Sequence, residues 1–388
     1  MNPRISPVLL SLVCCLAGAA GCRGSASRLP PPEEPARGER APVRLPRADE
    51  RRGVWDHGGI GRGAGEWMKV CRELRRNGIT DLFFNALWPD QAHYPSRLVP
   101  SSKTAVQQGN QLDHVLKAAH AQGLRVHLWK VCWKPRKLTP ARKAALHRQG
   151  RMQVSADGGT LDWLCPSHPH NRRMEADTLR EALRAYALDG IHLDYIRYPD
   201  AQACFCAGCR RRFHAETGRN VDDWPAAVLS GPARRAFLAW RREQITRLVR
   251  DAQAIARTAG RDVELSAAVY GWYPGVRDTL AQDWGAWLRD DLVDFVCPMT
   301  YTDDLAEFSA WVRTHLALPG ARGRVLPGIG VTTAHSTLDA ATARRQIQAA
   351  RQLGAPGFVL FDLDPYLQTE ILPRLGLGDA QGNGFDGV

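Results

Sequence analysis

Short apolar runs alternate with amphipathic helical segments along most of this chain. Compact apolar runs bounded by turn residues indicate strands, whereas apolar residues three or four positions apart indicate helices. The predicted strands begin or lie within residues 53–55, 81–88, 124–129, 189–199, 263–270, 294–301, 324–330 and 357–362. The predicted helices occupy residues 67–77, 112–122, 174–188, 232–259, 283–289, 305–316 and 337–353.

The regular alternation of strand and helix favours an α/β fold, a (β/α)8 TIM barrel spanning residues 51–375. The alternative is an open doubly wound sheet, because residues 59–64 fit the G-x-G-x-x-[GA] pattern of a dinucleotide site. Such a site needs an acid near the end of the second strand, where Asn85, Trp88 and Pro89 stand instead. We therefore prefer the barrel and interpret the glycines as a flexible first loop.

The N-terminal residues have the pattern of an export signal. Arg4 precedes an apolar run over residues 8–20, and residues 19–22 (Ala-Ala-Gly-Cys) fit a lipobox in which Cys22 is lipidated. Residues 1–21 are thus predicted to be a lipoprotein signal peptide. A plain signal peptide and a transmembrane anchor are the alternatives, although the run is too short to span a bilayer well.

Residues 22–50 are rich in proline and charge, which predicts an extended tether, and residues 376–388 are expected to form a flexible tail. The protein is accordingly expected in the cell envelope, exported and lipid-anchored, on the periplasmic or extracellular face. Its net charge of +12 suits anionic envelope polymers or lipid surfaces, or else is a solvated basic surface. No aromatic–basic recognition motif stands out, so a nucleic-acid partner is not expected.

Residues 189–199 (Asp-Gly-Ile-His-Leu-Asp-Tyr-Ile-Arg-Tyr-Pro) concentrate the chemistry of the chain. Side chains alternate across a strand, so Ile191, Leu193 and Tyr195 share one face while His192 and Asp194 share the other. Burying an unpaired charge is expensive, and catalytic groups of a barrel lie where its strands end. Asp194 is therefore the first catalytic candidate.

This segment resembles the signature of the bacterial lipoproteins called glycosyl-hydrolase-like family ten. Further similar segments are residues 52–55, 87–90, 94–96, 164–166, 282–284 and 294–301, so the resemblance covers nearly all of the predicted barrel. It implies a TIM barrel, an envelope location and hydrolysis of glycosidic bonds in a polysaccharide. The best-understood role in the family concerns the glycan strands of peptidoglycan.

Glycosidic cleavage usually requires two carboxyl groups. We expect Asp194 to be one of them, as acid, base or nucleophile. Its partner is predicted to be Asp362, on the face of Phe358 and Leu360 after the eighth strand, or Asp303 after the sixth. The alternative function is a non-catalytic carbohydrate-binding lipoprotein on a degenerate barrel.

Two neighbouring positions limit the mechanism. Asp189 opens the fourth strand at the opposite mouth and is interpreted as a turn or cap residue. Ile196 stands where a related barrel family carries its catalytic Glu, which argues against that mechanism.

Aromatic and polar side chains at or just after the strand ends predict a carbohydrate groove. The expected hydrolysis requires no cofactor. The expected substrate-binding residues are Trp88, Asn85, Trp129, His192, Tyr195, Arg197, Tyr198, Trp272 and Tyr301. Further candidates at the same rim are Trp133, Tyr270, Tyr273, Asp56, His57, His127 and Lys130.

Cys204, Cys206 and Cys209, with His214 five residues later, have the pattern of a metal knuckle. Three thiolates and an imidazole would complete a tetrahedral, structural zinc site, and a disulfide within the trio is the alternative in an oxidising compartment. The other cysteines beyond the signal are interpreted as small buried hydrophobes; they are Cys71, Cys132, Cys165 and Cys297. The motifs of zinc proteases and serine hydrolases, H-E-x-x-H and G-x-S-x-G, do not occur.

Overall fold

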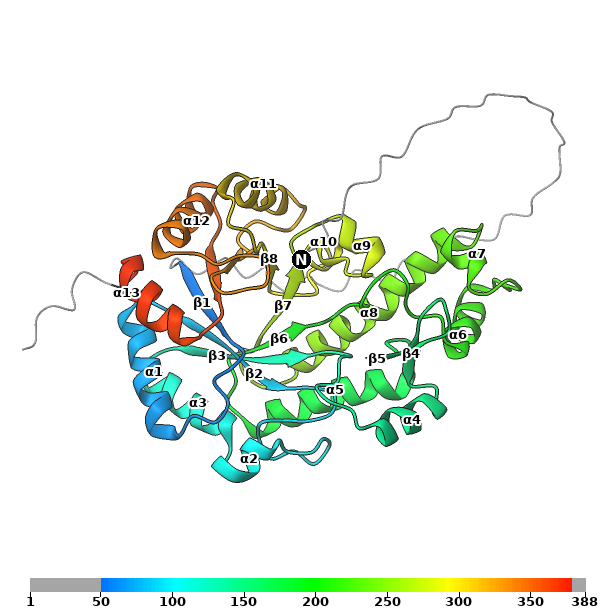
Figure 1. The fold of residues 1–388 in the computed structure, drawn as a ribbon, viewed down its shortest axis with the longest axis horizontal. Coiled ribbons are helices and arrows are strands. Elements are labelled where there is room, and N and C mark those ends of the chain that lie inside the picture. The colour runs from blue at the N-terminus through cyan, green and yellow to red at the C-terminus, as the bar shows by residue number, and fades with distance from the viewer. Residues whose placement is uncertain (1–49, 379–388) are drawn as a thin grey trace, which may run out of the picture. The chain divides into compact units, whose positions relative to one another are not determined.

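Eight parallel strands close into a barrel in residues 50–378, the part of the chain that the computed structural model describes (Figure 1). The strands are β1 (Arg51–Asp56), β2 (Asp81–Leu87), β3 (Arg125–Val131), β6 (Gly190–Asp194), β7 (Glu264–Tyr270), β8 (Phe295–Met299), β9 (Gly328–Gly330) and β10 (Gly357–Phe361). They pair in the order β1-β10-β9-β8-β7-β6-β3-β2, and β2 pairs with β1 to close the ring. The predicted TIM barrel is confirmed and the open doubly wound sheet is excluded.

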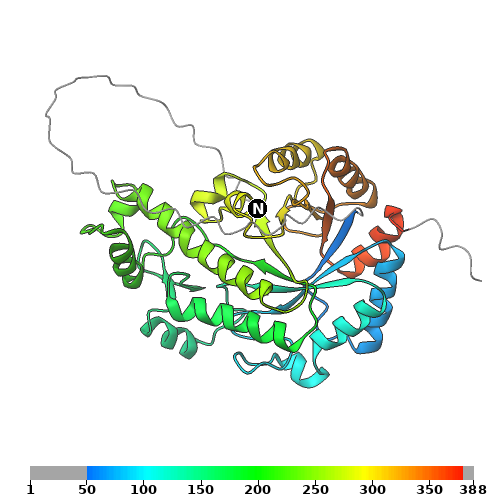
Figure 2. The same cartoon turned by 180° about the vertical axis from the view of Figure 1, so that it is seen from behind.

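Helices surround the barrel, and α5 and α8 run side by side along one flank in both views (Figures 1 and 2). The helices of seven or more residues are α1 (Ala64–Arg76), α3 (Gln111–Ala121), α4 (Pro140–Arg148), α5 (Pro169–Ala185), α6 (Ala207–Thr217), α8 (Arg234–Arg257), α11 (Leu305–Leu316) and α12 (Ala340–Gln352). The shorter ones are α2 (Lys103–Gln108), α7 (Ala226–Leu229), α9 (Gly275–Thr279), α10 (Trp284–Arg289), the π-helical turn η1 (Leu367–Ile371) and α13 (Leu372–Leu375). Within the described range, no helix has the length and apolar character needed to cross a membrane.

The structure adds elements that the sequence pattern did not predict. The main addition is an antiparallel hairpin of β4 (Met152–Val154) and β5 (Thr160–Leu164), which lies between α4 and α5 in the chain. The packed region also extends past its predicted end, because Leu377 is buried and its carbonyl oxygen accepts a hydrogen bond from Arg52. The predicted signal peptide, Cys22 and nearly all of the tether lie outside the described residues.

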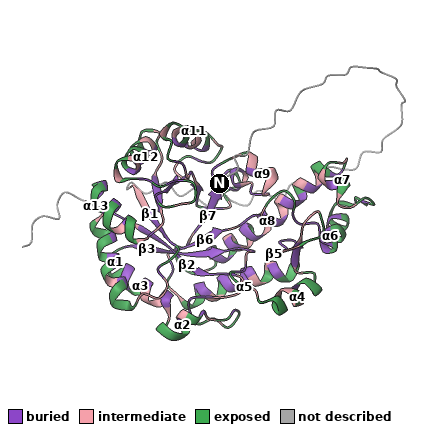
Figure 3. Cartoon of the chain, in the orientation of Figure 1, coloured by how far each residue is buried: buried purple, intermediate pink, exposed green. Residues whose placement is uncertain are grey.

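Two apolar layers form the core, one inside the barrel and one between the strands and the helices. Figure 3 shows the strands almost entirely buried, whereas the helices expose one side. The amphipathic pattern explains this, as in α1, whose buried residues follow the helical repeat: Trp67, Val70, Cys71 and Leu74. The inner layer consists of Trp55, Phe83, Trp129, Ala268, Phe295, Cys297, Leu326 and Val359.

Gly190 at the start of β6 makes room for a large polar side chain inside the barrel. It pairs with His127 of β3, and a Cβ atom at Gly190 would lie 2.1 Å from Nδ1 of His127. Only glycine permits such a close approach.

A charged cluster closes the amino-terminal end of the barrel. The carboxylate of Asp81, which is 1% exposed, forms ion pairs with Arg51 at 2.6 Å and Arg125 at 2.7 Å. His127 Nε2 lies 3.0 Å from the same carboxylate, and both arginines also pair with Glu264. Burial alone would raise the pKa of Asp81, but the His127 hydrogen bond and the two arginines hold it well below the ordinary value. His127 was predicted at the substrate rim, so that assignment is wrong.

Asp81→Asn should lower the free energy of unfolding by roughly 3–5 kcal/mol at pH 7, because it removes the buried anion that Arg51 and Arg125 share. Glu264, which is 20% exposed, is a weaker partner for these partly buried arginines. The depressed pKa means that Asp81 stabilises the fold above its unfolded pKa of about 3.9 and loses this effect as pH falls. The difference between wild type and variant should therefore shrink below about pH 4. Denaturant unfolding at several pH values measures it.

Asp113→Asn is the matched control, since Asp113 pairs with Lys117 on an exposed face of α3. This change should cost less than about 0.5 kcal/mol. Equal losses in the two variants would contradict a special role for the Asp81 cluster.

Candidate active site at the carboxyl ends of the strands

Asp194 is the last residue of β6 and faces the barrel interior, as the alternation predicts. Its Oδ2 accepts a hydrogen bond from Trp129 Nε1 at 3.1 Å, and its Oδ1 accepts one from the Tyr195 backbone N–H at 2.6 Å. The residue is 6% exposed. Burial raises the pKa of Asp194 above its ordinary value, although these hydrogen bonds and the positive charge of Arg197 oppose the shift.

Asp362 follows β10 and lies beside the start of the loop after β1. Its Oδ1 accepts a hydrogen bond from the His57 backbone N–H at 3.0 Å, and burial raises its pKa as well. The predicted face was wrong, because Phe358 and Leu360 pack in the helix-facing layer. Asp362 nevertheless turns toward the barrel mouth.

His57 and Tyr301 connect these two carboxyl groups. The His57 side chain interacts electrostatically with both Asp194 and Asp362. Burial, followed by the charges of the same two carboxyls, raises the pKa of the Tyr301 phenol. Asp194 and Asp362 therefore belong to one site, which the sequence pattern could only suggest.

Aromatic rings form the wall between the two carboxyls. Phe361 stacks on Tyr301 with ring centroids 5.6 Å apart, and His57 lies 5.8 Å from the indole of Trp129. Trp129 is 5% exposed and donates to Asp194, so it orients a carboxyl as well as lining the mouth.

Asn85 on β2 is a buried amide aimed into this site. It follows the interior residue Phe83 by two positions and pairs in register with Trp129. Its Oδ1 and Nδ2 are both buried without a hydrogen-bond partner in the structure. Buried amides are normally satisfied, so Asn85 is well suited to bind a polar group that enters the mouth.

Asp56 is a carboxyl whose importance the sequence pattern understated. Its Oδ1 accepts the Gly59 backbone N–H at 2.8 Å, while its Oδ2 is buried without a hydrogen-bond partner. Burial raises the pKa of Asp56 to about 7; Arg62 opposes this shift, and the nearby charge of Asp362 adds to it. A Cβ at Gly59 would lie 2.2 Å from the Asp56 carboxylate, so this glycine lets Asp56 hold the loop that carries His57.

Arg197 and Tyr195 form a cationic rim next to Asp194. The Arg197 guanidinium lies over the rings of Trp163, Tyr195 and Tyr270, at 5.2, 4.9 and 4.8 Å from their centroids. Its hydrogen bonds go to neutral oxygens, which are the Tyr198 and Pro199 carbonyls and the Tyr270 hydroxyl. The charge of Arg197 is thus held in place without a carboxylate contact.

Two left-handed residues shape the loops that leave β3 and β6. Trp133 has φ 62° and Tyr195 has φ 53°, which is uncommon for residues other than glycine. The Trp133 N–H is held by a hydrogen bond to Glu175, and the Tyr195 N–H by its bond to Asp194. Such conformations concentrate at functional sites.

Several predicted binding residues lie elsewhere. His192 is fully buried, where its Nδ1 bonds to Ser266 and its Nε2 accepts the Trp55 N–H, so it supports the site from below. Tyr198 is fully buried with Arg241 over its ring. Neither is placed to touch a substrate, so both assignments are corrected: these side chains were needed to fill the core.

Trp88, Trp272 and Asp303 are also outside the cluster around Asp194. Trp88 is buried and packs edge-on against His93, with Arg136 over its ring. Trp272 is 62% exposed on the loop after β7, and Asp303 is exposed after β8. Asp362, rather than Asp303, is the carboxyl that the fold couples to the same side chains as Asp194.

The structure groups the predicted metal ligands differently from the sequence pattern. Cys204, Cys206 and Cys209 lie together, but the fourth residue of the cluster is Cys165, not His214. His214 is exposed on α6, which removes it as a ligand, and Cys165 is not an isolated hydrophobe. A second cluster of Asp81, His127 and Glu264 already has cationic partners in Arg51 and Arg125.

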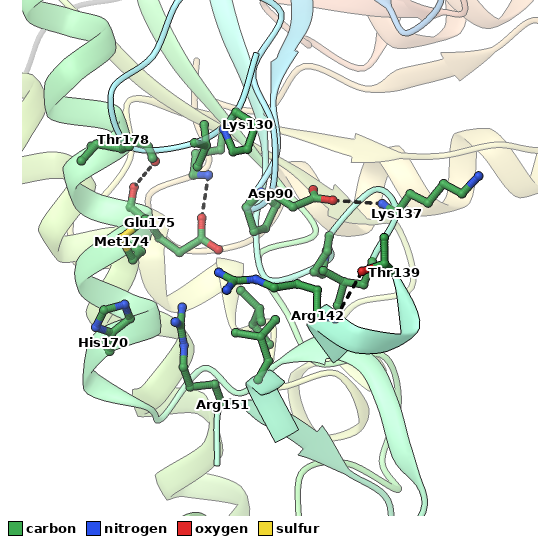
Figure 4. Close-up of a pocket in the computed structure, with 18 residues that line it drawn as sticks. Asp90, Lys130, Lys137, Thr139, Arg142, Arg151, His170, Met174, Glu175 and Thr178 are labelled. Atoms are coloured by element: carbon green, nitrogen blue, oxygen red, sulfur yellow. Dashed lines mark hydrogen bonds and ion pairs between the residues drawn. The ribbon is translucent and has the colours of Figure 1, made fainter. Parts of the chain in front are cut away.

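A separate cavity of about 390 Å³ lies outside the barrel wall, next to β3 (Figure 4). Lys130 and Glu175 form a fully buried ion pair at 2.6 Å at its end. Arg142 and Arg151 extend toward the same space. Lys130 follows Trp129 in β3, so this cavity and Asp194 lie on opposite sides of the strand. The prediction that Lys130 contacts substrate at the barrel mouth is therefore wrong.

The chain belongs to the family described as glycosyl hydrolase-like 10, whose sequence model matches residues 69–317. The predicted family is therefore confirmed.

Individual relatives are distant. "Glycosyl hydrolase DigH" of Escherichia coli strain K12 is 24% identical over 263 residues, which are 59% of this chain and 56% of that protein. "Glycosyl hydrolase YngK" of Bacillus subtilis strain 168 is 22% identical over 273 residues, which are 61% of this chain and 48% of that protein. The chain thus spans about half the length of these curated relatives.

Solved structures with a similar fold include enzymes that act on sugars. The glycoside hydrolase domain of PgaB (BpsB) from Bordetella bronchiseptica has a TM-score of 0.66 at 15% identity, covering 81% of this chain and 94% of that chain. A beta-galactosidase from the psychrophilic Marinomonas ef1 has a TM-score of 0.58 at 13% identity, covering 84% and 56%. At such identities the likeness establishes the barrel fold.

The raised pKa of Asp56 predicts how stability depends on pH. The folded state holds the proton more tightly than the unfolded chain, whose Asp pKa is about 3.9. The stabilising effect is therefore complete below about pH 4 and is lost as pH rises through about 7. Asp56→Asn cannot ionise, so between pH 5 and pH 8 its melting temperature should fall less than that of wild type.

Thermal unfolding at about pH 5, 6, 7 and 8 measures this difference, because these values lie on both sides of the Asp56 pKa of about 7. Asp290→Asn is the control, because Asp290 is half-exposed and pairs with the neighbouring Arg289. Parallel curves for wild type and Asp56→Asn would contradict the raised pKa.

Proposed function

We propose that this protein is a glycoside hydrolase that cleaves a polysaccharide with Asp194 and Asp362. The observation that carries the proposal is the placement of two carboxyls with raised pKa, the buried Asp194 and the half-buried Asp362, around His57 and Tyr301. Family membership and the barrel fold support it.

The chemistry follows from the surroundings of the two carboxyls. A carboxyl whose pKa is raised keeps its proton closer to neutrality and can donate it to the leaving oxygen of a glycosidic bond. Burial, and then the like charge of the neighbouring Asp364, raises the pKa of Asp362. The Trp129 and Tyr195 donors stabilise the ionised form of Asp194. We therefore assign the proton-donor role to Asp362 and the anionic role to Asp194.

Asn85, Tyr301 and the aromatic wall are the proposed sugar contacts. The free donor and acceptor of Asn85 match a pair of sugar hydroxyls. A buried polar group that is satisfied only by the correct ligand gives strong selectivity.

The proposed substrate is a glycan that carries carboxylates, such as the glycan strands of peptidoglycan with their muramic acid lactyl groups. Arg197 supports this choice, since its guanidinium lies beside Asp194 and contacts only neutral oxygens. A carboxylate is the natural partner of such a group.

The proposed location is the cell envelope, with the barrel anchored by a lipid on Cys22. The lipobox and the proline-rich residues that follow it support this placement.

Asp194→Asn should reduce glycan cleavage by about 10³-fold or more, because the amide keeps the size but loses the charge and proton. The melting temperature should fall only modestly, since the amide keeps one of the two acceptor oxygens that bind Trp129 and Tyr195. Mass spectrometry of the products from purified peptidoglycan glycan strands measures cleavage. Asp362→Asn should cause a similar loss, whereas Asp303→Asn should not.

The matched control is Asp189→Asn, which makes the same change in the same strand motif at the opposite end. Asp189 accepts the Val126 N–H and pairs with His120 at 2.8 Å, so this variant should stay active and lose some stability. Unchanged cleavage by Asp194→Asn would remove this residue from the mechanism. Tight glycan binding without cleavage by wild type would favour the carbohydrate-binding alternative.

Arg197→Met should raise KM for strands with free lactyl carboxylates by about 10-fold to 100-fold, the effect of losing one charged hydrogen bond. The same strands after methyl esterification are the matched substrate, and their KM should not change. Methionine keeps the packing against the rings of Tyr195 and Tyr270. Equal effects on both substrates would contradict carboxylate recognition.

A further inference from the structure

Four buried cysteines converge beside the loop that leaves β6. Cys165 follows β5, Cys204 and Cys206 lie in the loop before α6, and Cys209 lies in the first turn of α6. Their sulfur atoms all lie within 4.8 Å of one another. The Sγ of Cys165 is 3.9 Å from that of Cys206 and 3.5 Å from that of Cys209.

These distances match a tetrahedral metal site. Zinc–sulfur bonds of about 2.3 Å place the four sulfurs of a tetrahedron about 3.8 Å apart. In a disulfide, two sulfurs would lie about 2.05 Å apart, and the bond would involve only those two. Here each of the four sulfurs lies within 4.8 Å of the other three. Cys165 and the trio of Cys204, Cys206 and Cys209 come from two distant parts of the chain, and their convergence indicates a shared central ion.

Donors around the sulfurs favour their anionic form. The Cys209 N–H points to Sγ of Cys206 at 3.3 Å, and the Val154 N–H points to Sγ of Cys204 at 3.4 Å. Arg212 directs a guanidinium N–H to Sγ of Cys165 at 3.8 Å. Hydrogen bonds of this kind orient metal-bound ligands and stabilise their charge.

Positive charge is also available to balance the site. Four thiolates around Zn²⁺ carry a net charge of −2. Arg212 contacts the cluster, and the buried guanidinium of Arg241 interacts with Cys204 and Cys209 while its hydrogen bonds go to backbone carbonyls. Two cations thus lie beside the four sulfurs and can offset this negative charge.

We propose that Cys165, Cys204, Cys206 and Cys209 bind one Zn²⁺ as a structural tetrathiolate site. Four protein thiolates leave no open coordination position, so the ion stabilises the fold rather than taking part in chemistry. The site fastens the β4–β5 hairpin and the segment before α5 to the loop after β6. That loop begins with Tyr195 and Arg197, so the metal fixes one wall of the catalytic mouth from outside.

Figure 1 shows that α6 lies next to this hairpin. The same junction has backbone contacts, since the Phe205 N–H donates to the Val154 carbonyl and the Ala156 N–H donates to the Gln202 carbonyl. A metal at this point therefore adds a cross-link to segments that already pack together.

Metal analysis of the full chain, purified without chelators, tests the proposal. Inductively coupled plasma mass spectrometry should find one zinc ion per chain. His214→Ala should keep the zinc and Cys165→Ser should lose most of it, which separates four-cysteine ligation from the three-cysteine, one-histidine pattern. Cys71→Ser is the matched control, because Cys71 is equally buried but lies on α1.

A measurement on wild type keeps the test valid if Cys165→Ser does not fold. Titration of the folded protein with a mercurial reagent should release zinc, detected with a chromogenic chelator, in step with modification of four thiols. Cobalt exchanged into the site should give the absorption bands of tetrahedral thiolate coordination. Zinc-free protein with the four cysteines in disulfides, or iron in place of zinc, would overturn the assignment.

Discussion

Pairing of β1 with β10 closes the barrel, and the geometry of the mouth depends on this closure. The two strands come from opposite ends of the described chain and align Val54 with Leu360. Beyond the ladder, the Leu363 N–H bonds to the Trp55 carbonyl and the His57 N–H bonds to Asp362. The carboxyl of Asp362 is thereby fixed relative to β1, although 305 positions separate it from His57.

The pKa values of the acids shift in opposite directions at the two ends of the barrel. At the amino-terminal end, Asp81 is surrounded by arginines, which hold its pKa well below the ordinary value. At the carboxyl end, Asp194 and Asp362 receive hydrogen bonds from neutral N–H groups, and burial raises the pKa of both. The amino-terminal end thus pairs its acid with cations, as a stabilising cluster does, while the raised pKa values at the other end are typical of functional sites.

Sequence patterns were sufficient for the barrel and for the orientation of Asp194, because both follow from local periodicity. The strand alternation correctly turns His192 and Asp194 inward. The same rule failed for Asp362, because the residue lies beyond the strand, where the chain no longer alternates. It also could not distinguish Tyr198, which fills the core, from Tyr301, which lines the mouth.

Long-range contacts account for the other errors. Cys165 gives no local signal of its role, since its three partners lie about forty residues further along the chain and meet it only through the hairpin that the pattern missed. The proximity of His214 to the cysteine trio in sequence is misleading, because Cys206 caps α6 and the helix carries His214 to the surface. Spacing identifies ligands only when the backbone between them is known.

Contacts outside the barrel wall hold the residues of the barrel mouth in position. Glu175 on α5 pairs with Lys130 and holds the left-handed Trp133, while the proposed zinc site holds the loop that follows Tyr195. Cys165 lies just before α5, so both supports act through the same helix and its preceding turn. A distortion there would move Trp129 and Tyr195 together, and these are the two donors to Asp194. The position and pKa of the Asp194 carboxyl therefore depend on packing that no substrate touches.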